Sequence, residues 1–218
     1  LDKIIHAIND VFNNKEWYES RYLPAKVTIC LYGPPGTGKT SLIKALAAYF
    51  NVPLYIGSLN VFSIDVLEEA MTTMTRPAFL LFEDIGDCDA VLASGSKYRQ
   101  ITRDIVKSGG NEASLFEEEE RYDRNEHALV KNSEVLNFFD GVIPLDEIVT
   151  FITTNNIELI DPVLLRRGRV DLSCYIGKLN DREIRKYLCR VYDLPSIEYE
   201  GVFEEISGCD LEAIFKEN

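Results

Sequence analysis

The chain has 218 residues, 46% of them hydrophobic, and a formal net charge of −13. This length and apolar content predict a globular protein with one domain of ordinary size and a small appendage. The charge disfavours a surface that follows nucleic acid, while five cysteines without a C-x-x-C pair argue against disulfides and zinc and favour a reducing compartment.

The first predicted elements lead to a phosphate-binding loop. Apolar residues recur at helical spacing over 1–12, and the β-branched and apolar run 27–32 predicts a buried strand. The stretch 33–40, GPPGTGKT, fits G-x-x-x-x-G-K-[ST] in full and precedes a helix predicted over 42–50. The alternative is a glycine-rich turn that matches by accident, and the strand and helix on either side argue against it.

Each residue type in this loop suits a nucleoside triphosphate. Glycines free the backbone to turn its N–H groups toward phosphate oxygens, at the positive end of the following helix. Lys39 is expected to reach the β and γ phosphates of ATP, and the Thr40 hydroxyl to ligate Mg²⁺. The aromatic connector Trp17–Tyr22 is interpreted as a contact with the base or as a staple of the first helix to the core. The predicted ATP-binding residues are Gly33, Pro34, Pro35, Gly36, Thr37, Gly38, Lys39, Thr40 and Ser41.

A central strand is predicted to end in two carboxylates. After a short strand over 53–56 and a helix over 64–74, the apolar run 79–82 leads into Glu83 and Asp84. Parallel strands deliver such residues to the carboxyl edge of a sheet. An acidic pair of this kind is common in α/β proteins, but about forty residues beyond a full phosphate loop it is a candidate Walker B motif.

Between residues 87 and 132 the sequence has little hydrophobic periodicity, which predicts an insertion of loops. Its acidic run Glu117–Glu120 is interpreted as a solvated face, with a docking site for a basic partner as the alternative. His6 and His127 lack metal-ligand partners at useful spacing, so neither is predicted to be a site.

The second half of the chain resumes the α/β pattern. A helix is predicted up to Asp140, and a strand over 148–155 ends in hydroxyls and the amide of Asn155. A short helix is predicted over 161–165, followed by a dense basic stretch, RRGR. A fifth strand is predicted over 172–176.

A smaller helical appendage is predicted after the fifth strand. Asn180, with Glu183 three residues later, forms the pattern of a capping box at the start of its first helix. The appendage continues to a last helix near the end of the chain.

The phosphate loop, the acidic strand end, Asn155 and the stretch 164–171, LLRRGRVD, resemble in order and spacing the AAA family of ring-forming ATPases. The resemblance implies an α/β P-loop NTPase fold, a three-layer sandwich with a central parallel five-stranded sheet, followed by a small helical lid. It also implies a large ATPase domain over 1–178, with the insertion at about 87–132, and a lid domain over 179–218.

The same resemblance implies a role for each candidate catalytic residue. Arg166 and Arg169 would be fingers inserted into the neighbouring subunit's site, so that hydrolysis requires assembly of a homo-oligomeric ring. Asn155 would position the attacking water. Glu83 would support Mg²⁺ through its water shell, and Asp84 would polarise the water.

Within the family, the chain resembles the Bcs-type branch, a mitochondrial inner-membrane chaperone that translocates a folded iron–sulfur protein, and its bacterial and viral relatives. Four stretches carry this resemblance: WYxxRxxP at 17–24, the inverted acidic pair, TTN at 153–155 and GRVDL at 168–172. GCDL at 208–211 resembles the glycine-containing lid motif near the adenine. The chain departs from the pattern at Arg167, where a proline is usual, and in its long acidic insertion and short lid.

The leading expectation is an ATP-hydrolysing ring chaperone or translocase that acts on protein and binds no nucleic acid directly. A nucleotide-dependent loader or remodeller of nucleic-acid complexes and an ATP-binding switch with little turnover remain alternatives. No apolar run approaches the length of a membrane span, so an anchor is expected only outside this segment. The expected location is cytoplasmic, with the matrix face of the mitochondrial inner membrane as the alternative.

Overall fold

The computed structural model of the protein describes residues 1–59, 64–88, 91, 132–140, 145–193, 195–196 and 204–211. The helices among them are α1 (Asp2–Asn13), α2 (Lys15–Glu19), α3 (Lys39–Phe50), α4 (Ile64–Thr73), α7 (Asn132–Asp140) and α8 (Asp181–Val191). The strands are β1 (Lys26–Tyr32), β2 (Leu54–Gly57), β3 (Ala78–Phe82), β4 (Ile148–Thr154) and β5 (Leu172–Tyr175). Short 3₁₀ turns, η1 (Ile85–Asp87) and η3 (Ile157–Leu159), follow β3 and β4.

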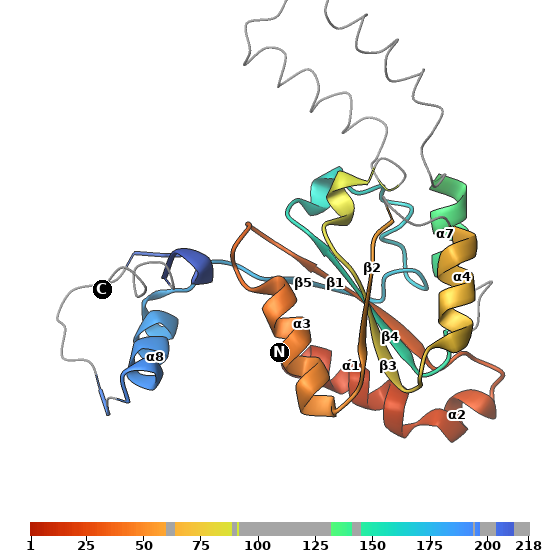
Figure 1. The fold of residues 1–218 in the computed structure, drawn as a ribbon, viewed down its shortest axis with the longest axis horizontal. Helices are drawn as coiled ribbons and strands as arrows, with labels where there is room; N and C mark the ends of the chain where they lie inside the picture. The colour runs from red at the N-terminus through yellow and green to blue at the C-terminus, as the bar shows by residue number, and fades with distance from the viewer. Residues whose placement is uncertain are drawn as a thin grey trace, which may run out of the picture.

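A five-stranded parallel sheet forms the centre of the fold, in the order β2-β3-β4-β1-β5. Every residue of β3 and β4 is buried, as expected for apolar strands of a parallel sheet that is covered on both faces. Figure 1 shows α1 and α3 on one side of the sheet, and α4 and α7 on the other. The predicted α/β fold with a central parallel five-stranded sheet is confirmed.

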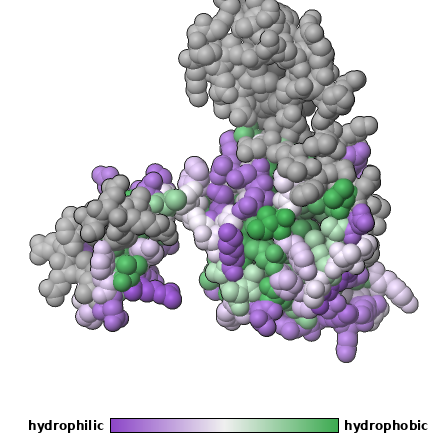
Figure 2. Space-filling view, viewed as in Figure 1, coloured by the Kyte–Doolittle hydropathy of each residue, from purple (hydrophilic) through white to green (hydrophobic). Residues whose placement is uncertain are grey.

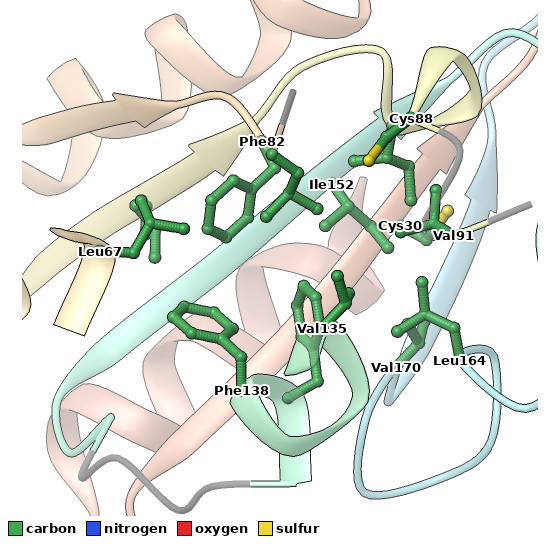
Figure 3. Packing of buried hydrophobic residues seen from close by; sticks show 14 of the residues in the cluster. Cys30, Leu67, Phe82, Cys88, Val91, Val135, Phe138, Ile152, Leu164 and Val170 are labelled. Carbon is green, nitrogen blue, oxygen red and sulfur yellow. The ribbon is translucent and has the colours of Figure 1, made fainter. Parts of the chain in front are cut away.

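Each face of the sheet has its own hydrophobic core, because successive side chains of a strand point to opposite faces. Phe79 and Leu81 of β3 pack with α1 and α3, whereas Leu80 and Phe82 pack with α4 and α7. Figure 3 shows the second core, in which Phe82 lies near Phe138 of α7. The acidic pair therefore follows a strand that is fixed from both sides.

The predicted short helix over 161–165 is wrong, because these residues form turns. The Asp161 carboxylate accepts a hydrogen bond from the Val163 N–H at 2.8 Å, and the Asp161 carbonyl accepts one from the Leu164 N–H at 2.9 Å. These bonds close one turn, and Gly168, with φ +93°, lies too close behind it for a helix to continue.

The aromatic connector fits the staple interpretation. Tyr18 donates a hydrogen bond to Asp10 of α1, and the Arg21 guanidinium lies over the Trp17 ring. The connector leads into the amino end of β1, whereas the phosphate loop follows its carboxyl end (Figure 1).

The insertion and lid predictions fall largely outside the described residues. Of the predicted insertion at about 87–132, residues 87–88, 91 and 132 are described, so Glu117–Glu120 and His127 lie outside. Of the predicted lid, the described parts are 179–193, 195–196 and 204–211. The domain boundaries stay predictions.

The surface combines polar areas with exposed apolar side chains. Figure 2 shows hydrophobic residues gathered near the middle of one face. No helix in the described part of the chain is both long and apolar enough to cross a membrane. Large hydrophobic residues that are about half exposed or more are Leu1, Trp17, Tyr22, Leu23, Tyr49, Ile56, Val66, Tyr175, Val191 and Tyr192.

Candidate functional site

A cavity of about 400 Å³ lies at the carboxyl edge of the sheet. The phosphate loop follows β1, Asp84 follows β3 and Asn155 follows β4, so three parallel strands bring their ends to one place. The lining residues are Pro35, Gly36, Gly38, Lys39, Thr40, Ser41, Asp84, Thr153, Asn155, Gly208 and Cys209.

The backbone of the phosphate loop requires glycine at two places where other chain segments approach it. A Cβ on Gly33 would overlap the carbonyl oxygen of Ile176, which follows β5. Gly36 has φ +73°, and a Cβ there would lie 3.1 Å from the Cβ of Cys209. The loop is also braced internally, because the Thr37 hydroxyl donates to the Pro34 carbonyl at 2.9 Å.

Lys39 is the most buried charged group of the cavity, with 7% of the residue exposed. Its ammonium donates to the Gly33 carbonyl at 2.8 Å, to the Pro34 carbonyl at 2.9 Å and to Asn155 Oδ1 at 2.9 Å. All three of its N–H donors therefore have partners. Partial burial lowers the pKa of Lys39, and the Asp84 carboxylate opposes this shift.

The two carboxylates of the acidic pair lie in different surroundings. Glu83 accepts a hydrogen bond from the Thr40 hydroxyl at 2.7 Å, whereas Asp84 lines the cavity. The Asp84 backbone is left-handed, with φ 45° and ψ 50°, and its N–H donates to Thr153 Oγ1 at 3.0 Å. A non-glycine residue in this conformation is strained, and such strain is common in functional sites.

The oxygen atoms beside the loop fit a magnesium ion. A hydroxyl and a carboxylate that already lie in contact, at Thr40 and Glu83, are the hard ligands this ion prefers. The described residues contain no group of three or more His, Cys, Asp or Glu side chains that could hold a metal by themselves. Magnesium usually takes one or two protein ligands and completes its shell with water and substrate phosphates.

The two candidate arginines do not line the cavity. Arg166 is exposed, and its guanidinium makes no hydrogen bond or ion pair with another residue that the structure describes. Arg169 instead makes two short bonds to Asp140 and a third to the Val163 carbonyl. The structure thus brings together Lys39, Thr40 and the residues at the strand ends, and leaves the arginine stretch apart from them.

Residues 204–211, called here the closing segment, reach the phosphate loop from the end of the chain. The Leu179 N–H donates to the Ile206 carbonyl at 2.9 Å, and the Cys209 N–H donates to the Gly36 carbonyl at 3.1 Å. The resemblance of GCDL at 208–211 to a lid motif predicted that this segment lies near the adenine, and Gly208 and Cys209 line the cavity. The sequence offered the hydroxyl of Thr153 only as part of a polar strand end. The hydrogen bonds from Cys209 to Gly36 and from Asp84 to Thr153 were not predicted.

Comparison with known proteins gives matches along most of the chain. A model of the ATPase family associated with various cellular activities (AAA) matches residues 29–178. A probable mitochondrial chaperone bcs1 of Schizosaccharomyces pombe is 31% identical over 192 residues, which cover 87% of this chain and 37% of that protein. A probable mitochondrial chaperone BCS1-B of Dictyostelium discoideum is 32% identical over 196 residues, which cover 87% and 42%.

The mitochondrial chaperone BCS1 of Homo sapiens is 30% identical over 197 residues, which cover 88% of this chain and 41% of that protein. The chain therefore spans about two fifths of the length of these curated relatives. The predicted resemblance to the AAA family and its Bcs-type branch is confirmed. The expected cytoplasmic location is wrong, because the names of these relatives point to the mitochondrion.

Proposed function

This chain belongs to the AAA family of ATPases, and on that basis we propose that it is the ATP-hydrolysing part of a ring-forming, Bcs-type protein chaperone or translocase. One observation carries the proposal: Lys39, Thr40, Asp84 and Asn155 come from distant parts of the sequence and line one cavity. Membership in the family implies nucleotide binding. The assembly into a ring, the protein cargo and the roles of the catalytic residues are what we propose.

In the proposed mechanism, the loop and the acidic pair hold MgATP. The glycine-rich backbone and the Lys39 ammonium surround the β and γ phosphates, and the lysine exchanges carbonyl partners for phosphate oxygens. Thr40 and Glu83 would hold the magnesium ion, directly or through its water shell. When bound, this ion neutralises charge that builds on the phosphate oxygens.

Asp84 and Asn155 are proposed to act on the attacking water. Asn155 already contacts Lys39, so its amide lies beside the group that binds the terminal phosphate. Asp84 lines the same cavity and accepts the proton as the water attacks. Its left-handed backbone directs the carboxylate, and the bond from its N–H to Thr153 fixes that direction.

Arg166 is proposed to complete the site of the neighbouring subunit. It is exposed and does not line its own cavity. Positive charge brought to the terminal phosphate in the transition state raises turnover greatly. Each subunit would supply the loop and carboxylates of one site and the arginine of the next, in a head-to-tail ring.

The proposed partner is protein and not nucleic acid. The net charge of −13 disfavours nucleic acid, and exposed apolar residues on one face suit contact with protein (Figure 2). The relatives named above are called chaperones, and this chain is proposed to share that role.

The test of a shared site mixes two inactive variants. Asp84→Asn should bind ATP but stall hydrolysis, since an amide cannot accept the proton. Arg166→Ala should lose about three orders of magnitude in turnover while binding ATP nearly normally, by analogy with other arginine fingers. Arg167→Ala, which removes the exposed neighbouring arginine, is the control and should retain turnover.

Mixed rings of the two variants should regain activity. With random equal mixing, about a quarter of subunit contacts pair an intact Asp84 with an intact Arg166. Co-assembly is first shown by pull-down through a tag on one variant. Rings that are proven to be mixed and yet remain inactive in single-turnover assays would refute the shared site. If the unaltered protein showed no ATP turnover under any nucleotide condition, the alternative of an ATP-binding switch would be favoured instead.

A further inference from the structure

We propose that Arg169 is not a second finger but a positioning residue that holds Arg166 in place within its own chain, through Asp140 at the end of α7. The inference rests on the proposed function, because it concerns how the arginine stretch is presented to a neighbouring site. It changes the role predicted from the sequence for one of the two arginines.

The Arg169 guanidinium is committed within its own chain. Its Nε donates to Asp140 Oδ1 at 2.5 Å and its Nη2 to Asp140 Oδ2 at 2.6 Å, which is the two-pronged arrangement of the strongest arginine–carboxylate pairs. Its Nη1 donates to the Val163 carbonyl at 2.8 Å. Three of its five N–H donors are therefore used, and 18% of the side chain is exposed.

The electrostatic signature of this pair is consistent with the geometry. The hydrogen bonds from Arg169 lower the pKa of Asp140, and the same bonds raise the pKa of Arg169. The carboxylate consequently stays charged to a lower pH than an ordinary aspartate. The pair is lost only when the pH reaches the lowered pKa of Asp140.

The backbone at Arg169 is bonded directly to Arg166. The N–H groups of Arg169 and Val170 both donate to the Arg166 carbonyl, at 3.1 Å and 3.0 Å. Leu164 and Val170, on either side of this turn, are buried in the core that Figure 3 shows. The turn therefore has a fixed base and an exposed tip, and Arg166 projects from the tip.

The other partner, Asp140, is fixed by α7. Phe138 and Phe139 of this helix contact the Phe82 ring, with centroids 5.6 Å and 6.0 Å apart. Phe82 is the last residue of β3 and directly precedes Glu83. Arg169 thus joins the arginine turn to a helix that packs on the strand carrying the acidic pair.

A trans role for Arg169 would require both of its bonds to Asp140 to break before it could reach a phosphate. Asp140 would then compete with the phosphate for the same guanidinium. Arg166 faces no such competition, because its guanidinium has no partner among the described residues. Within the described part of the chain the two arginines are therefore unequal: Asp140 holds Arg169, whereas Arg166 is exposed.

Asp140→Ala separates the two roles. If Arg169 positions Arg166, this variant should lower kcat about tenfold to a hundredfold and leave KM nearly unchanged, since misplacement by about 1 Å has effects of this size. Arg169→Ala should have the same effect, and the double variant should be no worse than either single one. Thermal melting, and the variant Asp140→Asn of similar size, show whether a loss of turnover comes from misfolding. Arg167→Ala is the control.

If Arg169 were a finger, Asp140→Ala would free it and turnover would be kept or would rise. That result would overturn the inference. The exchanged pair, Asp140→Arg with Arg169→Asp, gives a second test. This double variant should regain part of the lost turnover if residues 140 and 169 bind each other. If residue 169 instead entered the neighbour's site, its aspartate would abolish hydrolysis.

Mixed rings assign Asp140 to one side of the subunit contact. Asp140→Ala subunits should recover activity with Asp84→Asn subunits, whose arginines are intact, and should not recover with Arg166→Ala subunits. The opposite grouping would overturn the inference. If mixed rings of Asp84→Asn and Arg166→Ala subunits do not recover activity, the proposal of a site shared between subunits is refuted. The comparison of Asp140→Ala with Arg169→Ala then still decides whether Asp140 and Arg169 act as a unit.

Discussion

Thr153→Val tests whether a single hydrogen bond holds the Asp84 carboxylate, the proposed catalytic base, in position. Thr153 is 2% exposed, and its Oγ1 accepts a hydrogen bond from the Asp84 N–H. Valine replaces the hydroxyl by a methyl group of similar volume, so the packing is nearly kept. The change leaves the Asp84 N–H without this acceptor.

The expected effect on stability is small, whereas that on catalysis is large. Loss of this hydrogen bond, which is only part-buried, costs about 1 kcal/mol. The free energy of unfolding should therefore fall by about this amount. A carboxylate displaced by about 1 Å should lower kcat about a hundredfold. ATP affinity should change little, because Lys39 and the loop keep their contacts.

Phosphate release measures kcat, calorimetry measures ATP affinity and urea unfolding measures stability. Thr150→Val is the matched control, since Thr150 lies on the same strand, is 1% exposed and pairs with Leu80 away from the acidic pair. It should retain turnover. If Thr153→Val retained full turnover, or if both variants lost turnover equally, Thr153 would not be what holds Asp84.

Three further predictions concern the helix cap, an ionisable group and the loop. Asn180→Ala should lower the free energy of unfolding by about 1 kcal/mol in urea titrations, because it removes one half of an intact capping box. Burial and the bond to Asp10 raise the pKa of Tyr18 to about 12, so its phenol should ionise well above pH 10 in ultraviolet titrations, and stability should fall as the pH rises from 10 toward 12. Gly36→Ala and Gly38→Ala both place a side chain at positive φ, but only at Gly36 would the Cβ press on the closing segment. Without nucleotide, only Gly36→Ala should therefore speed hydrogen exchange of the Cys209 N–H, which donates to the Gly36 carbonyl, as mass spectrometry would show.

The sequence predicted the parts of the molecule that depend on short stretches. The runs that became β1, β3 and β4 are apolar and bounded by turn or polar residues, so their type and order could be read directly. The phosphate loop and the acidic pair lie at the ends of such runs, and their place at one edge follows from the parallel arrangement. The capping box at Asn180 and Glu183 is equally local.

Contacts between distant stretches could not be predicted in this way. Asp140 and Arg169 are 29 residues apart, and either could have been a solvated surface charge. The left-handed backbone of Asp84 leaves no trace in residue type, since aspartate is compatible with many conformations. Asp161 illustrates the opposite error: its carboxylate accepts from the Val163 N–H as at a helix start, but the backbone after it forms only turns.

The topology of the sheet explains why the arginine turn and the cavity are separate. Residues that follow a parallel strand reach its carboxyl edge, whereas residues that precede one lie at its amino side. Arg166 precedes β5, and Leu172 at the start of β5 pairs with Ile29, four residues before Gly33. At about 3.3 Å per residue, this register sets the start of β5 about 13 Å back from the loop along β1. Under the proposed mechanism, an arginine on this side serves a neighbouring chain, so the ring and not the fold of one subunit completes the site.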